Sequence, residues 1–101
     1  GVEVEDLRTG ARRELFCDGL FVAIGRVPDT ALFAGQVELD PSGYIVADET
    51  TRTSVPGVFA VGDARTKAVR QIVTAVADGA VAAHYAEEFL LEDAVKDKNL
   101  S

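Results

Sequence analysis

The chain has 101 residues, 48% of them hydrophobic and 27% charged, which is enough apolar material for one globular domain and argues against intrinsic disorder. Its formal net charge of −7 disfavours partners that are themselves negative, namely nucleic acid and anionic membrane surfaces. A single cysteine excludes an internal disulfide framework and suits a reducing, cytoplasmic environment, and no apolar run approaches the ~20 residues that a membrane span needs.

The first predicted elements form a β-hairpin and a buried strand. Apolar and charged residues alternate over Val2-Glu3-Val4-Glu5, which is the period of a half-buried strand. A turn at residues 8–11 follows, and Glu14 to Cys17 is expected to return as the second strand of the hairpin. Asp18-Gly19 then turns the chain into residues 20–24, which are apolar on both faces, as in a central parallel strand.

Turn signals divide the middle of the chain. Thr30 to Phe33 is expected to begin a short helical turn. Asp40-Pro41-Ser42-Gly43 predicts a turn before a short strand at residues 44–46. The polar segment 48–54 predicts a loop or a sheet edge, and Val58 to Val61 predicts the second buried parallel strand.

One long helix is predicted from Val69 to about Leu91, followed by a frayed polar tail over residues 92–101. Apolar side chains recur at three- and four-residue steps, and this stripe is expected to face the rest of the fold. Its members are Ile72, Val73, Val76, Ala80, Ala83 and His84. Gly79 costs ~1 kcal/mol of helix propensity relative to alanine, which predicts close packing at that position. Buried strands with one long helix indicate the α/β class.

The most informative stretch runs from Thr53 to Asp63, TSVPGVFAVGD, in which a Pro-Gly turn precedes an apolar run that ends in Gly-Asp. The predicted helix opens soon afterwards, near Arg70-Gln71. Turn, buried strand, Gly-Asp and helix start, in this order, suit a polar cofactor at the carboxyl end of a strand. Gly62 lets the backbone approach a ligand closely, and Asp63 can accept hydrogen bonds from ligand hydroxyls. The helix start adds free N–H groups and a partial positive charge.

This stretch resembles the second flavin-binding motif of flavoproteins that have two dinucleotide-binding domains. Upstream, residues 21–30, FVAIGRVPDT, resemble the motif that links the two domains in that group. Arg70-Gln71 after the Gly-Asp is similar to the low-molecular-weight thioredoxin reductases, which are pyridine nucleotide-disulfide oxidoreductases. The resemblance covers roughly residues 1–91. It implies a partial FAD/NAD(P)-binding domain of the three-layer ββα type, with a β-hairpin, buried parallel strands and one long C-terminal helix.

Parts of that family's machinery are missing from the sequence. It contains no G-x-G-x-x-G phosphate loop and no C-x-x-C redox pair, since Cys17 is the only cysteine. The resemblance implies that residues 1–101 are the C-terminal segment of a FAD-binding domain, without the N-terminal flavin half and the nicotinamide-binding domain. The intact, homodimeric enzyme would pass electrons from NADH or NADPH through FAD to the disulfide of a thioredoxin-like partner. The segment alone is expected to be inactive.

The resemblance assigns cofactor binding to five residues, which are Gly62, Asp63, Arg70, Gln71 and Ile72. It implies that Asp63 accepts a hydrogen bond from the flavin ribityl chain, and that the first turn of the helix faces the pyrimidine edge of the ring. The alternatives are that Asp63 caps a nearby helix and that Arg70 only solvates the helix start. Ile72 departs from the alanine common in thioredoxin reductases and is similar to the alkyl hydroperoxide reductase flavoproteins.

The remaining candidate residues have ordinary interpretations. Arg26 lies in the resembling linking motif, with a surface ion pair as the alternative. Cys17 is interpreted as a small buried or edge hydrophobe, His84 as a packed or surface histidine, and Asp78 and Glu87 as solvated carboxylates. No catalytic residue and no metal site is predicted. Two rival functions stay open: a segment of an alkyl hydroperoxide reductase-type flavoprotein, and a non-catalytic remnant of the fold that acts as a binding module.

Overall fold

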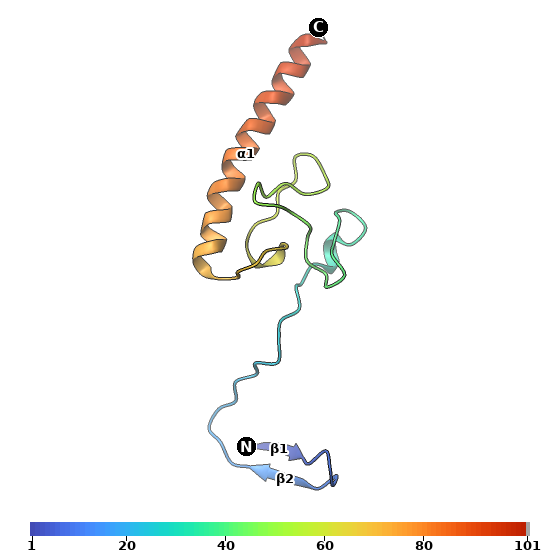
Figure 1. The fold of residues 1–101 in the computed structure, drawn as a ribbon, viewed down its shortest axis with the longest axis vertical. Helices are drawn as coiled ribbons and strands as arrows, with labels where there is room; N and C mark the ends of the chain where they lie inside the picture. Colours follow the sequence, from blue (N-terminus) through green and yellow to red (C-terminus); the bar gives the residue numbers. More distant parts are fainter. Residues whose placement is uncertain (101) are drawn as a thin grey trace.

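Five elements follow one another along the chain in the computed structural model, which describes residues 1–100 (Figure 1). They are the strands β1 (Val2–Glu5) and β2 (Arg12–Leu15), the 3-10 helices η1 (Ala31–Phe33) and η2 (Gly62–Ala64), and the helix α1 (Ile72–Asn99). The hairpin lies at one end and is joined by an extended stretch to a loop-rich section, beside which α1 runs (Figure 1). We call this loop-rich section, residues 28–70, the loop body.

The predicted hairpin is confirmed, with its second strand two residues earlier than expected. β1 and β2 pair antiparallel, with Val2 opposite Leu15 and Glu5 opposite Arg12. The turn closes at once because the Asp6 N–H donates to the carbonyl oxygen of Ala11 at 2.8 Å. Pairing therefore resumes directly after that carbonyl, before the Glu14 at which the return strand was predicted to begin.

The two buried parallel strands predicted from the sequence are wrong for this structure. Residues 20–24 run without a sheet partner among residues 1–100, and Phe21 is 98% exposed. Val58 to Val61 forms only an isolated antiparallel bridge, between Phe59 and Arg52. A strand that is apolar on both faces needs neighbours to satisfy its backbone and to cover its side chains. The described residues provide none for residues 20–24.

A small core holds the loop body together. Its buried members are Ile45, Ala47 and Ala60, with Val37 and Leu39 packed against them. The strand predicted at residues 44–46 is reduced to single bridges from Ile45, one antiparallel to Leu39 and one parallel to Arg65. The parallel bridge fixes the chain just after η2, because the Thr66 N–H donates to the Ile45 carbonyl at 2.9 Å. The helical turn predicted from Thr30 is present as η1.

α1 is longer than the predicted helix. It begins at Ile72 and continues to Asn99 through most of the residues predicted to form a frayed tail. Lys96 and Lys98 lie in its last turn, where cations complement the helix dipole. These charges, together with the hydrogen bonds of the preceding helical turns, favour a helix through the polar segment. Composition alone had assigned this segment to a tail.

α1 also turns a different face to the loop body than the sequence predicted. Ile72, Val73 and Val76 of the predicted inward stripe are 86%, 72% and 69% exposed. Buried or half-buried residues form the stripe that does face inward: Thr74, Ala75, Asp78, Val81, Ala82, Tyr85, Ala86 and Phe89. The close packing predicted at Gly79 is also wrong, since a Cβ there would meet no atom within 4 Å. The helix carries small or apolar residues on both faces, so the periodicity of the sequence could not show which face packs against the loop body.

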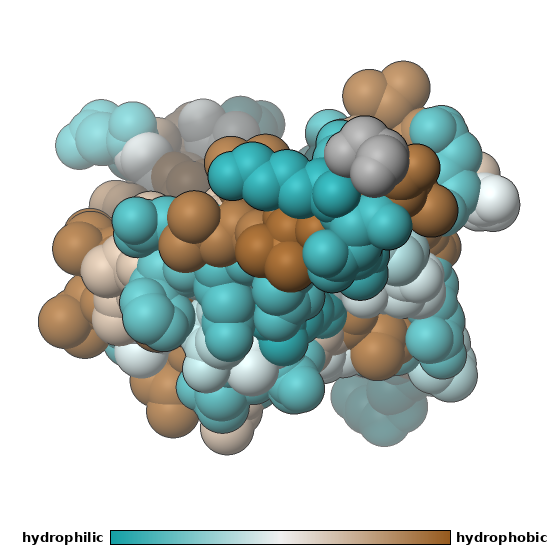
Figure 2. Space-filling model, turned by 90° about the horizontal axis from the view of Figure 1, so that it is seen from above, coloured by the Kyte–Doolittle hydropathy of each residue, from teal (hydrophilic) through white to brown (hydrophobic). Residues whose placement is uncertain are grey.

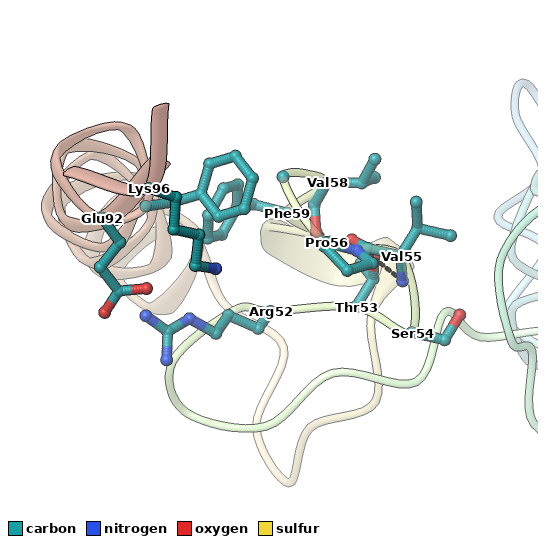
Figure 3. A pocket seen from close by; sticks show the side chains of 11 residues that line it. Arg52, Thr53, Ser54, Val55, Pro56, Val58, Phe59, Glu92 and Lys96 are labelled. Atoms are coloured by element: carbon teal, nitrogen blue, oxygen red, sulfur yellow. Dashed lines mark hydrogen bonds between the residues drawn. The ribbon is translucent and has the colours of Figure 1, made fainter. Parts of the chain in front are cut away.

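The Pro-Gly turn of the motif packs against the C-terminal half of α1 (Figure 3). A cavity of about 330 Å³ lies between them, with Arg52 on one wall and Glu92 and Lys96 on the other. Gly57 has φ +81, and a Cβ there would lie 3.1 Å from Cε1 of Phe89. Glycine at this position therefore serves both the turn and its contact with the helix. The contact anchors the apolar run that leads to Gly-Asp.

The chain exposes far more surface than a compact domain of its mass. Its accessible surface is 8085 Å², against ~5,500 Å² for a typical folded monomer of 10.7 kDa. Its radius of gyration is 21.4 Å, against ~13 Å for a compact domain of this length. Hydrophobic patches are open on the face shown in Figure 2. Within residues 1–100 no helix combines the length and the apolar character that crossing a bilayer requires. Apolar exposure on this scale is typical of surfaces that pack against further protein.

Candidate functional site

Two of the five predicted site residues, Asp63 and Arg70, line one cavity, whereas Gly62, Gln71 and Ile72 do not. Gly62 begins η2 with φ +74, and Asp63 follows with a side chain that is 49% exposed. The Arg70 guanidinium donates from Nε to the carbonyl oxygen of Asp63 and from Nη2 to that of Arg65, both at 3.1 Å. Arg70 therefore ties the Gly-Asp turn to the segment that enters α1. The alternative in which Arg70 only solvates the helix start is wrong.

The cavity beside this turn has a volume of about 320 Å³. Its lining residues are Arg26, Val27, Pro28, Asp29, Tyr44, Asp63, Ala64 and Arg70. One wall is a cation–π pair, because the Arg70 guanidinium carbon lies 3.8 Å from the centre of the Tyr44 ring. Sequence reasoning missed Tyr44, which comes from a distant turn and belongs to no motif. The cavity thus joins the Arg26-containing segment and the Gly-Asp turn, the two stretches that resembled flavoprotein motifs.

The start of α1 leaves backbone donors available. The Gln71 N–H donates to the Thr74 hydroxyl at 3.0 Å, and the first intrahelical bond runs from the Ala75 N–H to the Gln71 carbonyl at 3.1 Å. The N–H groups of Ile72 and Val73 precede that first bond, so the helix itself provides no acceptor for them. Their donors and the dipole make this end of α1 a favourable place for an electron-rich group.

Asp63 faces Arg26 rather than a helix terminus. Its Oδ2 lies 3.6 Å from Nη1 of Arg26, and the two side chains are 49% and 77% exposed. Asp63 caps neither η2 nor α1, where the preceding residues are Val61 and Gln71. The helix-cap alternative for Asp63 is therefore wrong, and Arg26 forms the surface ion pair considered for it. An exposed pair of this kind is worth at most ~1 kcal/mol, so the carboxylate is free to exchange partners.

Asp78 is buried, and its interpretation as a solvated carboxylate is wrong. Its side chain is 11% exposed and lies on the face of α1 that meets the loop body. It accepts hydrogen bonds from the Gly62 N–H at 2.9 Å, from Nζ of Lys67 at 2.7 Å and from Nη1 of Arg65 at 3.2 Å. Three donors from one segment of the loop body converge on a single helix carboxylate. We call Asp78, Arg65 and Lys67 the ionic cluster.

Besides Asp78, the Arg65 side chain also binds Asp48 and Glu49 of the loop body. Its side chain is 2% exposed, and Nη2 donates to the Asp48 carbonyl at 2.8 Å and to the exposed Glu49 carboxylate at 3.3 Å. Nε of Arg65 is buried and has no hydrogen-bond partner among the described residues. Such complete burial of an arginine requires its charge to be compensated, and Asp78 provides that compensation.

The partners of Asp78 decide its protonation. Burial raises the pKa of this carboxyl, but the hydrogen bonds from Lys67 and the Gly62 amide, with the charges of Arg65 and Lys67, outweigh burial and hold the pKa below its ordinary value of 3.8. Asp78 is therefore ionised throughout the neutral range, and its negative charge offsets one of the two buried cations beside it.

We expect acid to weaken the fold through Asp78. A carboxyl whose pKa is lower in the folded state stabilises the protein above its unfolded pKa, and this contribution is lost as the pH falls through the lowered folded value. The difference in urea midpoint between the wild-type protein and Asp78→Asn should therefore hold from about pH 7 to about pH 4 and shrink below that. A difference that grows on acidification would contradict this assignment.

The other candidate residues lie away from the cavity. Cys17 is exposed just beyond β2, which contradicts the buried position given for it but not the edge position. His84 is exposed and meets the Tyr85 ring edge-on, with centroids 5.0 Å apart, which confirms the surface alternative of its interpretation as a packed or surface histidine. Glu87 is exposed, as predicted. Across residues 1–100 there is no group of three histidine, cysteine or acidic side chains that is arranged to hold a metal ion.

Comparison with known proteins agrees with the motifs. Residues 1–79 match the family described as pyridine nucleotide-disulphide oxidoreductase. The chain is 51% identical over 89 residues to a thioredoxin reductase of Treponema pallidum, and 46% identical over 92 residues to one of Peptoclostridium acidaminophilum. These matches cover 88% and 85% of this chain but only 29% of each relative.

Solved structures give the same result. The fold resembles the crystal structure of Lactococcus lactis thioredoxin reductase with a TM-score of 0.73 and 40% identity, over 89% of this chain and 30% of that one. The structural match supports a partial FAD/NAD(P)-binding fold, in which the described residues form two antiparallel strands and one long helix. The family match covers far more than half of the chain. This chain therefore belongs to the pyridine nucleotide-disulphide oxidoreductase family.

Proposed function

We propose that residues 1–101 are the C-terminal segment of the FAD-binding domain of a thioredoxin-reductase-like flavoprotein. The observation that carries this proposal is the cavity beside the Gly-Asp turn, where Asp63 and Arg70 lie together next to the start of α1. The N-terminal flavin half and the nicotinamide-binding domain would belong to the rest of the protein. The relatives support this assignment, since the chain spans 29% of their length.

Asp63 on the cavity wall fits a flavin together with Gly62 and the start of α1, which do not line the cavity. Gly62 places the turn close to α1, where a Cβ would lie 3.7 Å from Cβ of Ala75. The half-exposed Asp63 carboxylate on the cavity wall can accept hydrogen bonds from the hydroxyls of a ribityl chain. The N–H groups of Ile72 and Val73 can donate to an electron-rich ring edge, and the helix dipole favours negative charge at that edge. These groups are donors and acceptors of the kinds that a flavin requires.

The chain's own residues bind and orient the cofactor. FAD would supply the redox chemistry, accepting electrons from a nicotinamide and releasing them to a disulfide. Asp63 would hold the ribityl chain. The hydrogen bond from Arg70 to the Asp63 carbonyl would fix the position of the turn relative to Gln71 and Ile72 at the helix start. No step of electron transfer is assigned to a side chain of this segment, whose only cysteine is the exposed Cys17.

The whole protein would transfer electrons from NAD(P)H to a thioredoxin-like disulfide partner in the cytoplasm. This part of the proposal rests on the names of the relatives, which are thioredoxin reductases. We propose a homodimer, because the exposed apolar side chains of this segment need cover from protein. The net charge of −7 on this segment disfavours nucleic acid as a partner.

Purification of the full-length protein tests the proposal. We expect a yellow protein with flavin absorbance bands, which reduces the disulfide of thioredoxin at the expense of NADPH or NADH. A protein that takes up no FAD from excess cofactor would contradict the flavin assignment. A flavin-loaded protein that oxidises nicotinamide but leaves every protein disulfide intact would contradict the reductase assignment alone.

A further inference from the structure

We propose that Asp78 is a positioning residue of the flavin site, which fixes Asp63 by holding the Gly62 amide. This inference rests on the proposed function, because it assigns a role toward the same cofactor. Asp78 belongs to none of the motifs that identified the site, and it does not line the cavity. It acts through the backbone of the turn, by accepting the hydrogen bond of the Gly62 N–H.

Asp63 is held between two anchored backbone groups. On one side, the Gly62 N–H donates to Oδ2 of Asp78 at 2.9 Å. On the other side, the Asp63 carbonyl accepts from Nε of Arg70 at 3.1 Å. The two anchors come from different parts of the chain, α1 and the segment that leads into it. Together they leave the backbone of Asp63 little freedom to rotate, which directs its side chain toward the cavity.

The turn requires such an anchor because of its conformation. Gly62 has φ +74, a region that glycine reaches without steric cost but does not prefer over its other conformations. Val61 before it is extended, so the backbone changes direction sharply at this point. A charge-assisted hydrogen bond to the Gly62 amide selects this one conformation from those that glycine can adopt. Loss of the bond would release the turn without removing any group that touches the cofactor.

The ionic cluster keeps the carboxylate in place. Lys67 and Arg65 donate to the same carboxylate that receives the Gly62 amide, at 2.7 and 3.2 Å. Both cations lie a few residues after Asp63 in the sequence. Asp78 of α1 therefore binds both the Gly-Asp turn and the segment that follows it. The carboxylate is thus fixed by charges whose positions depend on the same loop. This arrangement links the geometry of Asp63 to the packing of α1.

A double-mutant cycle on the full-length protein tests the inference through the dissociation constant of FAD. Asp63→Ala, Asp78→Ala and the double variant are titrated with FAD, and apo melting temperatures are recorded for each. Asp78→Asn is carried in parallel, because it keeps an acceptor for the Gly62 amide and is the fallback if Asp78→Ala does not fold. Glu88→Gln is the matched control, since Glu88 is a half-exposed carboxylate of α1 paired with Arg52 at 3.1 Å.

We expect Asp78→Ala to weaken FAD binding about tenfold in the wild-type background and less than about threefold once Asp63 is alanine, because coupled residues are not additive. Asp78→Asn should recover part of the affinity, and Glu88→Gln should leave it unchanged. Equal effects of Asp78→Ala in both backgrounds, with Asp63→Ala itself harmful, would overturn the inference and leave the proposed function standing. No effect of Asp63→Ala on FAD affinity would also overturn the inference, whereas a wild-type protein that binds no FAD would overturn the proposed function.

Discussion

Replacing Asp78 with alanine should lower the free energy of unfolding by about 3–5 kcal/mol, because it removes the buried anion beside two buried cations. Arg65 would keep only the exposed Glu49 carboxylate, at 3.3 Å. Arg65 and Lys67 have side chains that are 2% and 5% exposed, so water cannot take over the role of the lost carboxylate. The Gly62 N–H also loses its acceptor. Urea denaturation of the full-length protein, followed by circular dichroism, measures the effect.

Two control variants make this prediction specific to buried charge. Arg65→Met should cost less than Asp78→Ala, because it leaves Asp78 and Lys67 as a balanced pair. Glu88→Ala breaks an ion pair on the same helix, in which both side chains are nearly half exposed, and should cost no more than about 1 kcal/mol. If Asp78→Ala and Glu88→Ala cost the same, the burial of the ionic cluster would have no energetic consequence.

Replacing Asp63 with alanine should weaken FAD binding by roughly tenfold to a hundredfold. The lost contact is a charge-assisted hydrogen bond from a ribityl hydroxyl, worth about 1.5–3 kcal/mol. Asp63→Asn keeps an acceptor oxygen and should lose less. Fluorescence titration of the apo full-length protein with FAD measures both constants. Asp93→Ala, which removes an exposed carboxylate in the C-terminal part of α1, is the control and should bind FAD like the wild type.

Local patterns predicted the elements that depend on local structure. The alternation in residues 2–5 and the turn residues after it predicted the hairpin. This was possible because the two strands are close in sequence, both within the first 15 residues. The long helix was also predicted, because 3.6-residue periodicity is a property of one segment. The buried strands failed because a strand depends on neighbours, which residues 20–24 do not have among the described residues.

The residues of the candidate site also divide into those that a local motif predicted and those that depend on the packing of distant segments. Asp63 and Arg70 lie only seven positions apart in the sequence, so their proximity at one cavity followed from the motif. Tyr44 and Asp78 were missed because their places depend on how distant segments pack. A signal for Asp78 was present: it is the one carboxylate in the alanine-rich first half of α1, and two cations follow the Gly-Asp turn. A lone charge on a flank of small residues predicts a buried partner.

Melting apo and FAD-loaded protein side by side, for the wild type and Asp63→Ala, tests the flavin assignment most directly. The pair of Asp63 with Arg26 is exposed, so the two apo proteins should melt within about 1–2 °C of each other. Bound cofactor stabilises the folded state by an amount that grows with the logarithm of its concentration divided by its dissociation constant, so FAD should raise the melting temperature of the wild type clearly more than that of Asp63→Ala. Equal stabilisation of both proteins by FAD would remove Asp63 from the flavin site and contradict the account.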